Sequence, residues 1–201
     1  MKHWEWALLT AFLLSFWSSC FWDFSQSCTE IREDTLRLHI LANSDSAEDQ
    51  QLKLMVRDQI LDETAHLFAG TMDREDAVAA ARDALPQMLD AARSLLQEQG
   101  CDVPVSGDVI PLYFETRQYD EVTLPAGVYD AVQIRIGEAR GKNWWCVLFP
   151  PLCIGAAAAE PEELPEEAAL TLSELQSLSV EYVPKFAAVE WFEKIKQKRK
   201  G

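Results

Sequence analysis

Three histidines, His3, His39 and His66, are the side chains of this 201-residue chain best suited to acid–base or metal chemistry. Nothing pairs them at the spacing of metal ligands, and the chain has no HExxH motif and no C-x-x-C pair. Ser44 and Asp45 follow His39 closely, so the three could form a hydrolytic group. No nucleophile elbow surrounds Ser44, however, and both residues are better explained as turn and helix-capping residues. We therefore expect no catalytic centre, no metal and no cofactor.

The five cysteines could form disulfide bonds that stabilise the fold. If the chain turns at the two prolines between Cys146 and Cys153, the Cβ atoms of these cysteines come to disulfide distance. We favour that bridge over two buried thiols in an apolar segment. Cys101 is then unpaired, or paired with Cys28 if that residue is retained, and the odd number leaves at least one thiol free.

The composition excludes several other kinds of site. There are 18 Lys+Arg against 33 Asp+Glu, a net charge of −15. Nucleic acid is not an expected partner, because phosphate binding needs a concentrated basic face. Gly137 and Gly141 lack the strand–glycine–helix context of a dinucleotide site or a P-loop. Carboxylates are so numerous that no single pair indicates glycoside hydrolysis.

The N-terminus has the order of a secretory leader. Lys2 gives a basic start, an apolar run extends from Ala7 to Trp17, and small residues follow at 18–20. Residues 1–27 are therefore expected to be a signal peptide. An uncleaved membrane anchor is the alternative, since the segment approaches the ~20 residues that span a bilayer. The rest of the chain is expected to be exported. Four of the seven tryptophans lie in this leader: Trp4, Trp6, Trp17 and Trp22.

Hydrophobic periodicity predicts a strand and a capped helix after the leader. Residues 36–41 alternate apolar and polar side chains, as in a half-buried strand, and end in a turn of Asn, Ser and Asp residues. Ser46 with Asp49, or Asp45 with Glu48, gives a capping box for the helix that follows.

A second helix is expected after the first. The first helix should reach about Phe68, and a break at 70–73 precedes the next periodic segment. That segment has a continuous apolar stripe from Ala77 to Leu96 at helical period. Gly100 stands where a C-terminal cap is expected.

From residue 101 onward the period is that of strands. Residues 109–114 form an edge-strand candidate because of Pro111, and residues 128–136 form a second candidate. Residues 144–149 are apolar throughout, and the glycine-bounded loop before them indicates a hairpin. The order predicts an α+β fold: an N-terminal export helix, then a strand, two helices, an antiparallel strand meander and a C-terminal helix.

Two segments complete the chain. Residues 155–170 are rich in Ala, Glu and Pro without an apolar stripe, which favours an acidic linker or insertion. Residues 171–201 are a helical end with a basic tail. The lysines from Lys194 to Lys200 are explained equally well by the helix macrodipole and by contact with an anionic membrane surface. The expected divisions are 1–27, 28–154, 155–170 and 171–201.

Two blocks of this sequence resemble the stage II sporulation protein R family. The first reads LRLHILANSDS from Leu36 and continues to Asp58. The second reads LPAGVY from Leu124 and continues through GKNWWCVLFPPLC to Cys153. With the leader, the resemblance covers about residues 1–154.

The resemblance implies a signalling protein of endospore-forming bacteria and not an enzyme. Members are made in the forespore and secreted into the intermembrane space between forespore and mother cell. There they activate a membrane-embedded aspartic protease of the mother cell, which cleaves pro-sigma-E. The alternatives are an exported cell-wall hydrolase using His39 with Asp45, and a cell-wall binding protein using surface tryptophan.

We expect contact with that protease around Asn143, Trp144 and Trp145. The two tryptophans are adjacent on a strand and must point to opposite faces. One is expected in the core, and the other is expected to be covered by the helices or by a partner. Asn43 and Asp45 are further candidates, although turn chemistry explains each of them better.

Overall fold

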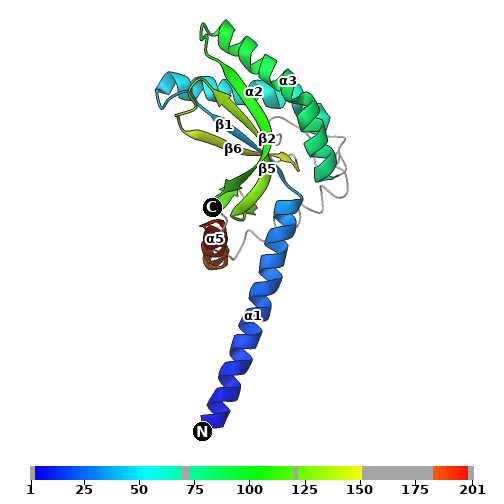
Figure 1. Ribbon diagram of the computed structural model, residues 1–201, viewed down its shortest axis with the longest axis vertical. Helices are drawn as coiled ribbons and strands as arrows, with labels where there is room; N and C mark the ends of the chain where they lie inside the picture. The colour runs from blue at the N-terminus through cyan, green and yellow to red at the C-terminus, as the bar shows by residue number, and fades with distance from the viewer. Residues whose placement is uncertain (1–2, 69–72, 120–121, 151–182, 199–201) are drawn as a thin grey trace. The chain divides into compact units, whose positions relative to one another are not determined.

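The computed structural model describes residues 3–68, 73–119, 122–150 and 183–198, and it divides the chain into two compact units (Figure 1). All five predicted contact residues belong to the second of these units. Unit 1 comprises Met1–Arg32, Glu115–Gly127 and Leu175–Gly201, and unit 2 comprises Glu33–Phe114 and Val128–Glu174.

Unit 2 is built on a four-stranded mixed sheet with the strand order β2-β5-β1-β6. β1 runs parallel to β5 and antiparallel to β6, so that His39 has Gln133 on one side and Trp145 on the other. The first strand of the chain is therefore a central strand of the sheet. The strands are β1 (Leu36–Leu41), β2 (Val105–Phe114), β5 (Gly127–Ile136) and β6 (Asn143–Phe149).

The α+β class is confirmed, and the sheet order corrects the expected meander in one respect. β5 and β6 are not neighbours, because β1 lies between them, so residues 137–142 form a connection across β1 and not a hairpin loop. Alternation along a strand identifies the strand but does not say which other strand pairs with it. β2 lies at an edge of the sheet, as Pro111 predicts, since proline has no N–H to donate.

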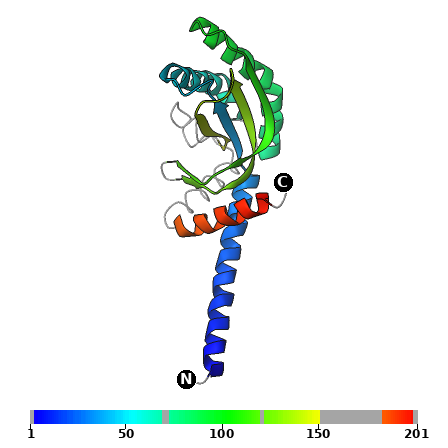
Figure 2. The ribbon, with the colours of Figure 1, turned by 60° about the vertical axis from the view of Figure 1, so that its left-hand side comes forward.

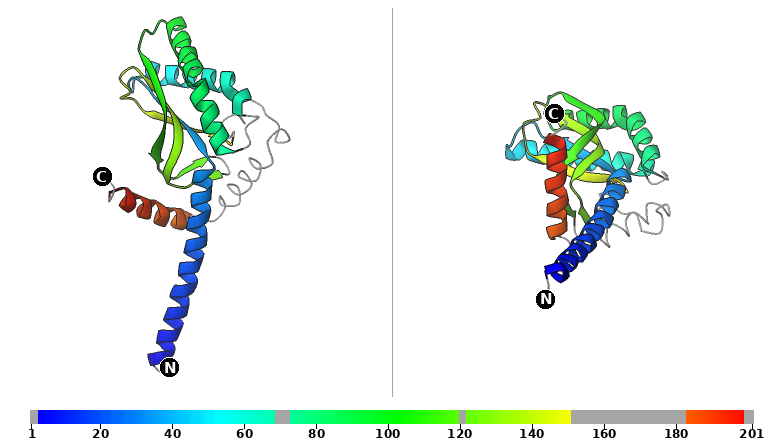
Figure 3. Two further views of the ribbon diagram at one scale, coloured as in Figure 1. Left: turned by 45° about the vertical axis from the view of Figure 1, so that its right-hand side comes forward. Right: turned by 60° about the horizontal axis from the view of Figure 1, so that its bottom comes forward.

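Two helices, α2 (Ala47–Phe68) and α3 (Arg74–Glu98), cover one face of this sheet (Figures 1 and 3). Alternate residues of β1 and β5 point into the layer between sheet and helices, because side chains along a strand alternate between its faces. Small alanines on α3 let that helix approach the sheet closely. The core includes Leu38, Ile40, Val56, Ala81, Met88, Ala92 and Ile134.

The ends of both helices follow the predicted capping chemistry. The N–H of Asp49 donates to Ser46 Oγ at 3.1 Å, which satisfies one of the unpaired donors at the start of α2. After α3, Gly100 adopts a φ of +73°, and the N–H of Cys101 donates to the carbonyl oxygen of Leu96 at 2.8 Å.

The sheet face opposite these helices carries the alternate side chains of the same strands. Arg37 and His39 of β1 are 0% and 6% exposed, so β1 is covered on both faces and not half-buried as its alternation indicates. The Arg37 guanidinium lies 4.0 Å from the ring centre of Phe114, a cation–π contact that favours a charge at this buried position. A second apolar cluster lies on this face: Phe114, Tyr129 and Ala131, with Leu112 and Trp145 packed against it.

Unit 1 combines two helices with a small antiparallel ribbon. In Figure 2, α5 crosses the C-terminal part of α1. An ion pair between Arg32 of α1 and Glu193 of α5, at 3.8 Å, joins the two helices. Arg32 also donates to the carbonyl oxygen of Ala126 at 3.0 Å. The elements are α1 (His3–Glu33), β3 (Arg117–Tyr119), β4 (Val122–Leu124) and α5 (Val183–Lys198).

Helix α1 is exposed over its first two-thirds and packed near its end. Trp4 and Trp22 are 60% and 73% exposed, whereas Phe24, Cys28 and Ile31 are at most 6% exposed. Among the helices described, none is both long and apolar enough to cross a membrane. The expected leader stays a prediction.

Two of the predicted segments cannot be compared with the structure. The acidic linker at 155–170 and the stretch at 171–182 lie outside the described residues. The last helix is present: α5, Val183–Lys198, lies within the expected helical end at 171–201.

Candidate functional site

Two loops meet at one end of the sheet in unit 2, and they bring together the two sequence blocks quoted above. One loop, residues 42–46, leads from β1 into α2, and the other, residues 137–142, connects β5 to β6. The N–H of Gly141 donates to the carbonyl oxygen of Ala42 at 2.9 Å, and the N–H of Arg140 donates to that of Asn43 at 3.2 Å. We call these two segments the two-loop clasp.

The side chains of Asn43 and Asp45 hold the two-loop clasp together. Asn43 Oδ1 accepts the N–H of Glu138 at 3.0 Å, and its Nδ2 donates to the Asp49 carboxylate at 3.0 Å. The Asp45 carboxylate accepts the N–H of Lys142 at 2.7 Å. Both predicted contact residues thus have a positioning role inside the protein. Their direct contact with a partner stays a prediction.

The packing of the two-loop clasp leaves no room for a side chain at two of its glycines. Gly137 adopts a φ of +57°, and a Cβ there would lie 2.1 Å from Asn43 Oδ1. A Cβ at Gly141 would lie 2.2 Å from the carbonyl oxygen of Ser44. Glycine is therefore required at both positions by the close approach of the other loop.

Charged groups near the start of α2 connect the helix to the two-loop clasp. Ser44 Oγ donates to Asp49, and this hydrogen bond is the main reason that the pKa of Asp49 is lowered. Lys53 is only 4% exposed, and its Nζ donates to the carbonyl oxygen of Lys142 at 3.0 Å and to Gln50 Oε1 at 2.7 Å. Burial lowers the pKa of Lys53, and these acceptors satisfy its ammonium group.

Trp144 and Trp145 point to opposite faces of β6, as predicted. Trp144 faces the helices and packs against the core, and the Arg57 guanidinium of α2 lies 4.3 Å from its ring centre. Trp145 stacks on His39, with ring centroids 4.2 Å apart and ring planes 11° apart. The ring of Phe114 meets Trp145 edge to face at 4.8 Å.

The predicted contact residues lie around the two-loop clasp and the start of β6. Both tryptophans are half-buried, whereas Asn143 is exposed. Asn143 shares a sheet face with Trp145, because alternate residues of a strand point the same way. The structure thus brings together all five predicted residues: Asn43, Asp45, Asn143, Trp144 and Trp145.

His39 is buried beside Trp145 and does not form a hydrolytic group with Ser44 and Asp45. Gln133 Nε2 donates to His39 Nδ1 at 3.1 Å. Burial lowers the pKa of His39 to about 4, against the Asn143 side chain, which raises it, and together with the Arg37 charge, which lowers it. The imidazole is therefore neutral near pH 7. Asp45 is bonded to the Lys142 backbone, and no hydrogen bond or ion pair joins it to His39.

The sequence did not identify Lys53 and Arg57 as supporting residues. They are four residues apart on α2, which is a detectable helical spacing, but their polarity indicates a solvated face. Their targets, Lys142 and Trp144, lie in a distant segment of the chain. Periodicity along one helix carries no information about such a segment.

The cysteines form one disulfide that involves a described residue. Cys146 is disulfide-bonded, whereas Cys153 lies outside the described residues. The Cys146–Cys153 pairing stays a prediction. Cys28 and Cys101 are free thiols, so the alternative that paired them is wrong. Burial raises the pKa of the Cys28 thiol to about 12.

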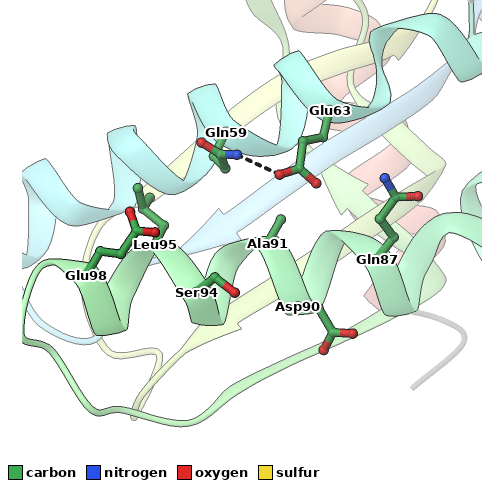
Figure 4. A pocket seen from close by; sticks show the side chains of 8 residues that line it. All are labelled: Gln59, Glu63, Gln87, Asp90, Ala91, Ser94, Leu95 and Glu98. Carbon is green, nitrogen blue, oxygen red and sulfur yellow. Dashed lines mark hydrogen bonds between the residues drawn. The ribbon is translucent and has the colours of Figure 1, made fainter.

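A hollow of about 580 Å³ lies between α2 and α3 (Figure 4). Glu63 accepts a hydrogen bond from Gln59 at 2.6 Å across one turn of α2. Within the described ranges, no group of three or more His, Cys, Asp or Glu side chains could hold a metal ion. The hollow adds no histidine or cysteine to the site. Its lining residues are Gln59, Glu63, Gln87, Asp90, Ala91, Ser94, Leu95 and Glu98.

Comparison with known proteins gives one family. The family model described as stage II sporulation protein R matches residues 32–159. The stage II sporulation protein R of Bacillus subtilis (strain 168) is 38% identical to this chain over 138 residues, which cover 66% of the chain and 62% of the relative. The chain thus spans less than two-thirds of the length of that curated relative. No solved structure matches the chain.

Proposed function

Because the chain belongs to the stage II sporulation protein R family, a family of sporulation proteins, we propose that it is a signal secreted from the forespore. In this proposal it reaches the intermembrane space and activates a membrane-embedded aspartic protease of the mother cell. That protease then cleaves pro-sigma-E. The chain acts by binding and not by catalysis.

The two-loop clasp is the observation that supports binding. The polar side chains of Asn43 and Asp45 are engaged between the loops, and His39 is buried and neutral. Asn43 and Asp45 are thus occupied in holding the loop before β6, and His39 is not available as an acid or base near pH 7. Exposed side chains on a fixed backbone are suited to binding, because little flexibility is lost when the partner docks. Lys142 and Asn143 are exposed in this way.

We expect the protease to contact Asn143 and Trp145, on the sheet face opposite the helices. His39 stacks on Trp145 and Phe114 meets its ring, so the orientation of this indole is fixed. Oriented aromatic anchors contribute much of the binding energy in many interfaces. Trp144 has a different role, because it supports the core beneath Arg57 of α2.

Co-expression of the chain with the candidate protease and its pro-sigma substrate, followed by a cleavage blot, tests this function. Asn143→Lys adds a charge at an exposed position and should abolish processing without unfolding the protein. Gln87→Lys makes the same change on the exposed surface of α3 and should leave processing unchanged. Trp145→Ala should also abolish processing in protein that circular dichroism shows to be folded. Absence of cleavage with the wild-type chain would refute the function. Normal cleavage with both Asn143→Lys and Trp145→Ala would refute the contact surface.

The same assay separates a signal from a cell-wall hydrolase. Asp45→Asn keeps an oxygen that can accept the N–H of Lys142, so the two-loop clasp should survive and processing should persist. A hydrolase that uses Asp45 as a carboxylate would lose its activity in this variant. Loss of processing in folded Asp45→Asn protein would show that processing needs the Asp45 carboxylate itself and would contradict a purely positioning role for Asp45.

A further inference from the structure

The net charge of the chain belongs almost entirely to one of its two units. Unit 1 contains nine Lys+Arg and nine Asp+Glu, so its net charge is zero. Unit 2 contains nine Lys+Arg and 24 Asp+Glu, and it carries the whole −15. An anionic surface therefore repels unit 2 but not unit 1.

Helix α5 of unit 1 has a packed face and an exposed face. Val189 is 3% exposed, and the carboxylate of Glu193 pairs with Arg32 of α1 at 3.8 Å, so both lie on the packed face. Trp191 and Ile195 each follow one of these residues by two positions, which is a rotation of about 200° around the helix. They lie on the opposite face and are 67% and 37% exposed.

Basic side chains accompany these two apolar ones. Trp191, Lys194, Ile195 and Lys198 have the spacing i, i+3, i+4 and i+7, so they form one stripe along α5. The Lys194 side chain is 49% exposed and also pairs with Glu190 at 2.6 Å and with Glu115 at 3.5 Å, while Lys198 is exposed. Tryptophan and isoleucine with lysines beside them are typical of helices that lie in the interface of an anionic bilayer.

Helix α1 of the same unit, whose residues up to 27 form the expected leader or membrane anchor, is also suited to lipid contact. Its first part exposes large apolar side chains that are between 46% and 69% exposed, as bilayer contact requires and water disfavours. The ion pair between Arg32 and Glu193 joins α1 to α5, so a surface that binds one helix is brought to the other. These apolar side chains include Trp4, Trp6, Leu8, Leu9, Phe12 and Leu13.

We propose that the exposed stripe of α5, formed by Trp191, Lys194, Ile195 and Lys198, docks on an anionic lipid bilayer. Trp191 and Ile195 enter the headgroup region, and the two lysines contact lipid phosphates. The acidity of unit 2 opposes its own binding to the same lipids. This docking goes beyond the proposed signalling function and does not require the protease.

Hydrogen exchange of the full chain, read by mass spectrometry on peptides of α5, tests the docking. The chain is titrated with vesicles of phosphatidylcholine alone, and with vesicles of equimolar phosphatidylcholine and phosphatidylglycerol. Exchange in α5 should slow only with the anionic vesicles. Peptides of α1 are read separately, and the neutral vesicles show how far binding through the apolar side chains of α1 alone slows exchange in α5.

Matched variants assign the effect to the stripe. Lys198→Gln should raise the lipid concentration at half-maximal protection by about fivefold, the usual contribution of one lysine near an anionic surface. Trp191→Ser should also raise it. Arg82→Gln removes one positive charge from the exposed surface of α3 and should leave it unchanged.

Two results would overturn the docking. One is equal exchange in α5 with anionic and neutral vesicles, and the other is an Arg82→Gln shift as large as that of Lys198→Gln. Neither protease nor pro-sigma substrate is present in this experiment. A negative result here therefore leaves the cleavage assay to decide the signalling function separately.

Discussion

Alanine in place of Gly137 would collide with Asn43 in the two-loop clasp. The φ of +57° at this position is the left-handed region, which alanine adopts at a cost of about 1–2 kcal/mol. Its Cβ would lie 2.1 Å from Asn43 Oδ1, so the Asn43 side chain has to move. That movement breaks the hydrogen bonds with Glu138 and Asp49, which contribute about 1 kcal/mol each. We expect Gly137→Ala to lower the free energy of unfolding by about 3–4 kcal/mol in total.

A double-mutant cycle separates the two contributions. Asn43→Ala alone removes the two hydrogen bonds and should cost about 2 kcal/mol. In the double variant the collision with Oδ1 is gone and only the Cβ of residue 43 remains close, at 3.0 Å. Its cost should therefore be about 2 kcal/mol less than the sum of the single costs. Urea unfolding followed by circular dichroism measures all four proteins. Additive costs would refute the inference that Asn43 occupies the space beside Gly137.

Gly100→Ala is the matched control for the backbone contribution. Gly100 also has a positive φ, +73°, but nothing lies within 4 Å of a Cβ built there. It should cost only the backbone contribution of about 1–2 kcal/mol. Its cost should add to that of Asn43→Ala, because the two positions do not touch. Coupling between them would show that the cycle reports a general loss of structure.

Two further predictions concern titration and thiol reactivity. The pKa of His39 falls from 6.5 to about 4 on folding, so the unfolded chain binds the extra proton between these values. The resulting stability is fully present above pH 6.5 and is lost as the pH falls toward 4, by about 1.4 kcal/mol per pH unit. Urea unfolding at several pH values should show a flatter profile for His39→Gln, and an unchanged profile would contradict the burial effect. Iodoacetamide should label half-buried Cys101 in native protein. It should label Cys28 only after unfolding, because burial raises the pKa of the Cys28 thiol to about 12. Peptide mapping should recover Cys146 joined to Cys153, and a bridge from Cys146 to another cysteine would refute the predicted pairing.

The helices could be predicted from the sequence more completely than the sheet. Capping at Ser46 and the positive φ at Gly100 depend on residues within a few positions, so the sequence locates them. The insertion of β1 between β5 and β6 depends on pairing across most of the chain. Alternation along a strand is a local property, and it cannot distinguish a neighbour in sequence from a neighbour in space.

In the candidate site, too, local features could be predicted from the sequence and long-range contacts could not. The opposite orientations of Trp144 and Trp145 follow from strand geometry alone. The approach of Asn43 to the loop before β6 does not, because it requires the sheet order first. By residue type alone, His39 is the best candidate for chemistry in this part of the chain. Burial between two neighbouring strands makes it a neutral stacking partner of Trp145 instead.

The central place of β1 also determines the order in which the sheet can assemble. β1 ends at Leu41, whereas its two neighbours begin at Gly127 and Asn143, so it leaves the ribosome long before either of them. Until then both of its backbone edges lack partners, and such edges are prone to pair with other chains. Pairing of segments so distant in sequence is also slow. A nascent chain released before residue 127 therefore contains the apolar faces of α2 and α3 without a sheet to cover them, and aggregation is its expected fate.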